Sequence, residues 1–77
     1  SAGIFLQLGA FSSFANAEGF RDTVRSQASN LAERFELFAD GERFRLHAGP
    51  YESMDAARNA ADRMGTLLKL KPLVIVR

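Results

Sequence analysis

The sequence predicts a small α+β domain whose strands and helices follow one another in the order βαββαβ. Three observations lead to this prediction: apolar alternation at 4–11 and 43–49, helical spacing of apolar residues after each segment, and an internal repeat. The repeat has the pattern Gly-x-aromatic-x-Ser-x-x-x-Ala and begins at Gly9 and again, forty residues later, at Gly49. Two copies of one strand–helix unit predict the ferredoxin-like (split βαβ) fold, a four-stranded antiparallel sheet of order 4-1-3-2 with both helices on one face.

Length and composition fit one domain over residues 1–77. Of the 77 residues, 47% are hydrophobic and 25% are charged, which is typical of an ordinary folded globule, and no cysteine is present. The formal net charge of +1 argues against purely electrostatic binding to nucleic acid or to an anionic membrane. No apolar run approaches the roughly 20 residues of a membrane span, so no direct membrane insertion is expected. Because the sequence starts with Ser-Ala-Gly, we expect residues 1–3 to be the flexible end of an excised fragment.

The first strand is predicted at 4–11, and its two faces differ. Alternation places four residues toward the helices: Ile4, Leu6, Leu8 and Ala10. The opposite face receives Phe5, Gln7, Gly9 and Phe11. A serine at 12 or 13 is the expected N-cap of a helix over 14–28, where apolar residues recur every three to four positions.

A hairpin is predicted in the middle of the chain. Residues 31–39 alternate and predict the second strand, and the third strand follows at 43–49. Between them, Asp40 and Gly41 form a dipeptide typical of two-residue hairpin turns.

The last part of the chain predicts a helix and an edge strand. Ser53 is the expected cap of a helix over 54–64, and Gly65 is expected to end that helix. Residues 73–76 are rich in β-branched side chains and predict the fourth strand, which the preceding lysines and proline mark as a sheet edge.

The side of the sheet without helices is the candidate functional surface. Its two central strands carry Phe5, Gln7, Arg45 and His47, which we expect to be exposed unless a ligand covers them. Aromatic faces attract sugars or bases, an amide both donates and accepts hydrogen bonds, and a guanidinium binds anions through two hydrogen bonds. These groups predict a platform for a polysaccharide or for a single nucleic-acid strand.

Simpler explanations exist for the same residues. Gln7 and His47 could be solvated side chains without a partner, and Arg45 could pair with Glu36 on the neighbouring strand. These alternatives stay open at the level of the sequence.

The turns after the two central strands contain residues with two possible roles. The rings of Phe11 and Tyr51 could contact a ligand or fold under the helices as core, and the repeat favours the structural role. Ser12 and Ser13 could cap the helix or meet a ligand at the end of the central strand.

No catalytic site, metal site or cofactor is predicted. The chain has one histidine, no cysteine and no glycine-rich phosphate loop. His47 could act as a general base, but Gln7 and Arg45 supply neither a nucleophile nor a paired acid beside it. We therefore expect a domain that is not an enzyme.

Two segments of the chain resemble the signatures of SPOR (sporulation-related repeat) domains. Residues 6–11 (LQLGAF) resemble the first-strand signature, and residues 44–51 (FRLHAGPY) resemble the second, aromatic-Arg-Val-x-x-Gly-Pro-aromatic. The resemblance covers essentially the whole chain. It is most pronounced toward the C-terminal domain of rare lipoprotein A-type septal peptidoglycan proteins.

This resemblance implies binding to bacterial peptidoglycan, specifically to GlcNAc-MurNAc glycan strands stripped of their stem peptides at the division septum. It implies a periplasmic monomer whose parent is an outer-membrane lipoprotein, with any glycan-cleaving activity in a separate domain. The ligand is then expected in a groove over the helix-free side of the sheet. Together with the residues chosen above, the expected glycan contacts are Phe5, Gln7, Ser12, Ser13, Asn16, Arg45, His47 and Tyr51.

The physical account of such binding centres on the lactyl carboxylate of each stripped muramic acid. Arg45 is suited to bind that carboxylate, and Gln7 to bind an acetamido or hydroxyl group. A stem peptide would collide with the groove wall and remove the charge, which gives selectivity for stripped strands.

Other functions use the same fold. An RNA-recognition-like module stacks bases on this side of the sheet, but His47 and Gly49 stand where its aromatic rings would be needed. An acylphosphatase-like enzyme needs an arginine in the loop after the first strand, and residues 9–12 contain none. A protein-interaction domain remains an alternative.

Overall fold

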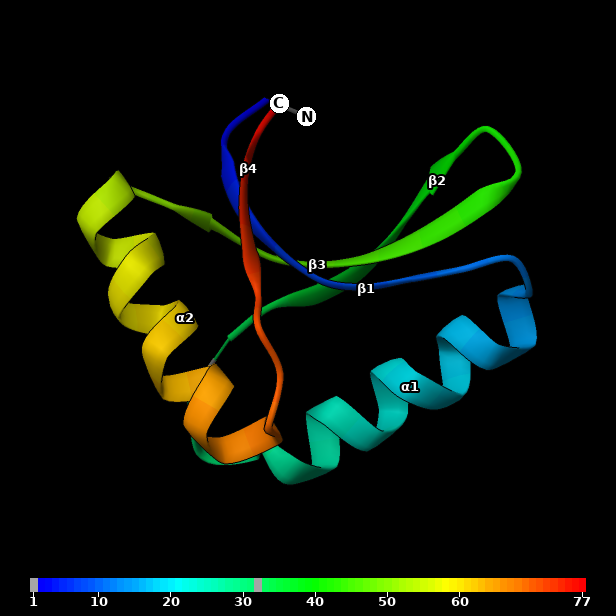
Figure 1. The fold of residues 1–77 in the computed structure, drawn as a ribbon, viewed down its shortest axis with the longest axis horizontal. Coiled ribbons are helices and arrows are strands. Elements are labelled where there is room, and N and C mark those ends of the chain that lie inside the picture. The colour runs from blue at the N-terminus through cyan, green and yellow to red at the C-terminus, as the bar shows by residue number, and fades with distance from the viewer. Residues whose placement is uncertain (1, 32) are drawn as a thin grey trace.

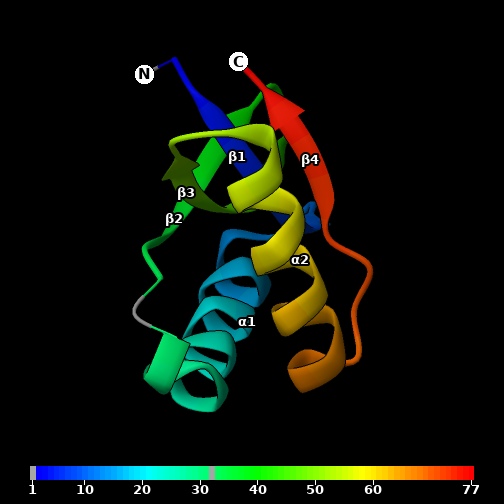
Figure 2. The same ribbon diagram turned by 90° about the vertical axis from the view of Figure 1, so that its left-hand side faces the viewer.

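The computed structural model describes residues 2–31 and 33–77 and confirms the predicted α+β fold. The elements in chain order are β1 (Ile4–Phe11), α1 (Phe14–Gln27), a 3-10 turn η1 (Ser29–Leu31), β2 (Phe35–Asp40), β3 (Arg43–Tyr51), α2 (Met54–Leu68) and β4 (Leu73–Val76). The strands form one antiparallel sheet of order β2-β3-β1-β4, as the repeat predicts. Figures 1 and 2 show both helices on the same side of this sheet.

Both helices begin where the repeat places a serine. Ser13 precedes α1 and its side chain accepts a hydrogen bond from the Asn16 backbone N–H at 3.2 Å. Ser53 does the same for α2, accepting from the Ala56 N–H at 3.0 Å. Each hydroxyl satisfies one of the backbone donors that a helix start leaves without a partner.

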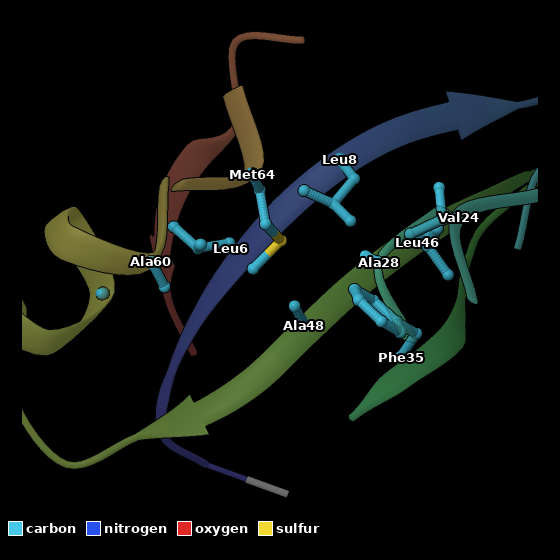
Figure 3. Packing of buried hydrophobic residues seen from close by; sticks show 10 residues of the cluster. Leu6, Leu8, Val24, Ala28, Phe35, Leu46, Ala48, Ala60 and Met64 are labelled. Atoms are coloured by element: carbon cyan, nitrogen blue, oxygen red, sulfur yellow. The ribbon is translucent and has the colours of Figure 1, made fainter. Parts of the chain in front are cut away.

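The helix-side core lies between the sheet and the two helices. Leu6 and Leu46, on the two central strands, are fully buried, as are Val24 of α1 and Met64 of α2. Figure 3 shows these side chains converging from opposite layers. The small residues Ala57 and Ala60, both fully buried, let α2 approach the sheet closely.

The prediction of strand from residue 31 is wrong. The Ala28 N–H donates to Val24 O and the Leu31 N–H donates to Ala28 O, so the chain stays helical through η1. The strand begins only at Phe35, and Ala32 lies outside the described residues.

The predicted helix end at Gly65 is also wrong. Helix α2 continues to Leu68, and Lys69 follows in the left-handed conformation at φ 59°. A Cβ at position 65 would lie 3.1 Å from the Leu70 carbonyl oxygen. This glycine therefore allows the returning chain to pass close to the helix rather than ending it.

Smaller differences concern the hairpin and the end of β3. Asp40 is the last residue of β2 and pairs with Arg43, so the turn residues are Gly41, at φ 63°, and Glu42. Strand β3 continues beyond the predicted end at residue 49 to Tyr51.

A bulge in β1 reverses the faces expected for its second half. Gln7 pairs with His47, but Gly9 pairs with Leu46, so one extra residue lies in β1. Beyond it, Ala10 pairs with Arg45 on the side away from the helices. Gly9 and Phe11 lie on the helix side, opposite to the prediction from strict alternation.

Contacts with α1 explain this change. The Phe11 ring packs on Phe20 of α1, with centroids 5.2 Å apart. A Cβ at Gly9 would lie 3.0 Å from the Phe11 ring and 3.3 Å from the Phe20 ring. The structural role that the repeat favours for Phe11 is therefore confirmed.

The chain ends meet at one end of the sheet. Gly3, in the segment expected to be flexible, exchanges two backbone hydrogen bonds with Arg77, of 2.7 and 3.0 Å. Neither helix in the described part of the chain is long and apolar enough to cross a membrane.

Candidate functional site

The candidate site is the side of the sheet away from the helices, which we call the helix-free face. The pairing of the strands places eleven residues there: Phe5, Gln7, Ala10, Glu36, Phe38, Asp40, Arg43, Arg45, His47, Leu73 and Ile75. The Arg77 side chain, directly after β4, extends over this face.

Phe5 and His47 are buried, so the prediction that they are exposed is wrong. Only 4% of Phe5 and 3% of His47 are accessible to solvent. The Arg77 guanidinium carbon lies 3.7 Å from the centroid of the Phe5 ring and 4.4 Å from that of Phe38. Phe38 in turn stacks on His47, with ring centroids 5.2 Å apart and an interplanar angle of 14°.

Sequence reasoning missed Arg77 and Phe38. Alternation places residues 73, 75 and 77 on one face of the last strand, and that signal could have identified Arg77. Alternation along residues 31–39 puts Phe38 on the same side of its strand as Glu36, but nothing local indicates that its ring covers a histidine from the next strand. Phe5 is consequently unavailable as a stacking platform for bases, which removes support for an RNA-recognition-like function.

His47 is the centre of a hydrogen-bonded chain on this face. Its Nδ1 lies 2.9 Å from an Arg77 terminal nitrogen, and its Nε2 lies 3.3 Å from Gln7 Oε1. Burial has the largest effect on the pKa of His47 and lowers it below its ordinary value of 6.5. The positive charges of Arg77 and Arg45 lower this pKa further. The neutral form of the imidazole therefore predominates at pH 7.

Arg45 is the arginine among the predicted site residues, and it is partly exposed. Its Nε donates to Asp40 Oδ2 at 3.1 Å, and 29% of its side chain is exposed. The expected partner Glu36 instead lies 3.6 Å from Arg34. Within the described residues the terminal nitrogens of Arg45 have no hydrogen-bond partner, so they can bind an external anion.

The turn between β1 and α1 lies next to Arg45. Phe11, the last residue of β1, is one position beyond the Ala10–Arg45 pair. Ser12 and Asn16 are exposed there, whereas the Ser13 hydroxyl caps the helix. This turn extends the polar surface at the Arg45 end of the central strands.

Tyr51 does not join the other candidates. It packs against the helix-side core, and its hydroxyl donates to Glu33 Oε2 at 3.0 Å, while Arg63 lies 3.4 Å from the other Glu33 oxygen. Burial, the hydrogen bond and the Glu33 charge raise the pKa of the Tyr51 hydroxyl. The geometry therefore favours a structural role for Tyr51.

No enclosed pocket is present in the part of the chain that the structure describes. Among residues 2–31 and 33–77, no three histidine or carboxylate side chains are grouped so that they could hold a metal ion. What the helix-free face offers is a shallow surface with an accessible guanidinium, an amide and apolar side chains at the β4 edge.

Two solved structures are similar to this chain. The peptidoglycan-binding domain of the Bacillus subtilis cell wall lytic enzyme CwlC shares 26% identity at a TM-score of 0.73, over 100% of this chain and 92% of that one. The RlpA SPOR domain from Pseudomonas aeruginosa shares 20% identity at a TM-score of 0.70, over 97% of this chain and 100% of that one, which shows a common fold. A search of curated proteins finds no significant match.

The match to a family model covers nearly the entire chain. The SPOR domain model aligns with residues 1–75, which include both strand signatures and both helices. The chain therefore belongs to the SPOR domain family.

Proposed function

We propose that this domain is a non-catalytic peptidoglycan-binding module that recognises glycan strands without stem peptides. The observation that carries the proposal is the partly exposed Arg45 guanidinium on the same face of the central strands as Gln7, where Arg45 pairs with Ala10 and Gln7 pairs with His47. Similarity to the peptidoglycan-binding domain of CwlC supports the same ligand class.

The lactyl carboxylate of muramic acid is the feature that Arg45 recognises in this proposal. An attached stem peptide converts that carboxylate into an amide and removes its charge, so a stripped strand gains a charge-assisted hydrogen bond that an intact strand lacks. Since no enclosed pocket surrounds the ligand, charge rather than a steric wall provides the selectivity. A shallow polar surface of this kind supports micromolar affinity, about −8 kcal/mol.

The structure changes which of the eight predicted residues are proposed as direct contacts. Gln7 and Arg45 are the central ones, and Ser12 and Asn16 extend the surface at the turn. Phe5 and His47 are buried and support these contacts from below.

In the cell, we expect the domain to act outside the cytoplasm. Stripped strands collect at the division septum, so the domain would direct its parent protein there, in the periplasm. Attachment of the parent to the outer membrane would depend on segments of the parent other than this domain. A monomer is sufficient for this function, and light scattering would measure the oligomeric state.

Co-sedimentation with purified sacculi tests the proposal. The domain is mixed with sacculi before and after an amidase has removed the stem peptides, and the bound fraction is measured. We expect binding to rise after amidase treatment. Equal binding to both preparations would contradict selectivity for stripped strands, and no binding to either would contradict the proposed function.

A further inference from the structure

The starting observation is a chain of hydrogen-bonding groups that crosses the helix-free face. It runs from Arg77, which follows β4, to His47 on β3 and then to Gln7 on β1, with distances of 2.9 and 3.3 Å. The proposed function makes only the last of these residues, Gln7, a direct contact of the ligand.

Arg77 is held in place at both ends of its side chain. Its backbone pairs with Gly3, and its guanidinium lies over the rings of Phe5 and Phe38. Contacts of this kind between a cation and aromatic faces favour one placement of a long side chain that is otherwise mobile.

The chemistry of arginine determines the direction of the hydrogen bonds. A guanidinium only donates, so the Nδ1 atom of His47 must be the unprotonated acceptor. The neutral imidazole then carries its proton on Nε2, which donates to Gln7 Oε1. The Gln7 amide is thereby oriented with its oxygen toward His47 and its NH2 group away from it.

We infer that Arg77 and His47 are positioning residues that make Gln7 a hydrogen-bond donor toward the bound glycan. The inference rests on the proposed function and adds to it which kind of chemical group Gln7 recognises. The group of the ligand that meets Gln7 is an acceptor oxygen, from either an acetamido carbonyl or a lactyl carboxylate, and not a hydroxyl hydrogen.

The side chain at position 7 provides the first test. Gln7→Glu keeps the shape of the side chain and can still accept from His47, but it has no donor, whereas Gln7→Met neither donates nor accepts. We expect both variants to bind amidase-treated sacculi about tenfold more weakly than the wild type. If Gln7→Glu binds better than Gln7→Met, Gln7 acts as an acceptor and the inference is overturned.

Arg77 is tested through the state of the histidine. His47 is the only histidine of the chain, so nitrogen-15 NMR of its side chain reports one tautomer without overlap. We expect the Nε2–H tautomer in the wild type. Arg77→Met should show a mixture of the two tautomers and bind glycan severalfold more weakly. Arg77→Lys, which retains a donor, should recover both the Nε2–H tautomer and the binding. Arg58→Met, which removes one positive charge from α2, is the control and should change neither readout.

Two glycan probes identify the source of the acceptor oxygen. The NMR signals of the Gln7 NH2 group are followed on adding peptide-free peptidoglycan strands or an N-acetylglucosamine tetramer, which has acetamido groups but no lactyl carboxylate. A shift with both probes identifies the acetamido carbonyl, and a shift with the first alone identifies the carboxylate. If the wild type binds but its histidine is protonated on Nδ1, this inference alone is overturned, whereas a wild type that binds no glycan overturns the proposed function.

Discussion

The two faces of the sheet bury their residues in different ways. On the helix side, Leu6 and Leu46 are covered by side chains of a second layer. On the helix-free face, Phe5 and His47 are almost equally inaccessible, yet the side chains of Arg77 and Phe38 cover them instead of a helix. The comparison teaches that burial alone does not separate structural from functional residues in this protein, because a cationic side chain can exclude water while satisfying a polar ring beneath it.

The largest effect is expected on the helix side. Leu6→Ala removes a fully buried side chain and should lower the free energy of unfolding by about 2–5 kcal/mol. Leu73→Ala is the matched control on the helix-free face, where 59% of the residue is exposed, and should change stability by less than about 0.5 kcal/mol. If urea denaturation shows equal losses of unfolding free energy in the two variants, a leucine on the helix-free face contributes as much to stability as one in the helix-side core.

Tyr51→Phe separates a structural hydroxyl from a ligand contact. Removing the donor leaves Glu33, whose side chain is 11% exposed, with Arg63 alone, at an expected cost of about 1.5 kcal/mol in unfolding free energy. Glycan binding should not change, because Tyr51 lies on the helix side. Weaker binding at unchanged stability would return Tyr51 to the site.

Arg45→Ala should weaken glycan binding with little change in stability, which is the opposite of the effect expected for Tyr51→Phe. We expect binding to amidase-treated sacculi to fall about tenfold, or about 1.4 kcal/mol. The free energy of unfolding should stay within about 1 kcal/mol, because the Arg45–Asp40 pair is partly exposed. Arg58→Ala on α2 controls for the lost charge, and a loss of folding in Arg45→Ala would show that a structural residue had been taken for a ligand contact.

The smallest effect is a dependence of stability on pH. The pKa of His47 is lower in the native state than its ordinary value of 6.5 in an unfolded chain. Between these two pKa values the unfolded state binds more protons than the native state. The contribution of His47 to the free energy of unfolding is therefore complete above pH 6.5 and decreases as the pH falls through this window. Urea denaturation near pH 7 and just below pH 6 should show a lower free energy of unfolding at the lower pH in the wild type but not in His47→Gln. If both proteins lose the same free energy, groups other than His47 cause the pH dependence.

Much of the fold could be predicted from the sequence because its signals are local. Alternation, helical spacing, the serine caps and the repeat determined the order of the elements, and the repeat implied the topology of the sheet. Gln7 and Arg45 were placed on the helix-free face for the same reason, since Gln7 comes before the bulge of β1 and Arg45 lies in the regular part of β3.

Only the tertiary structure decided the features that depend on distant partners. The bulge before Gly9 depends on how Phe11 packs on α1, and it reverses the faces that alternation predicts. The contact between Arg77 and His47 joins residues thirty positions apart, so no local pattern could indicate that the ring is buried and neutral. Periodicity describes where a side chain points on an ideal strand. Whether that side chain is buried, and whether it donates or accepts a hydrogen bond, depends on which side chains of other strands reach it.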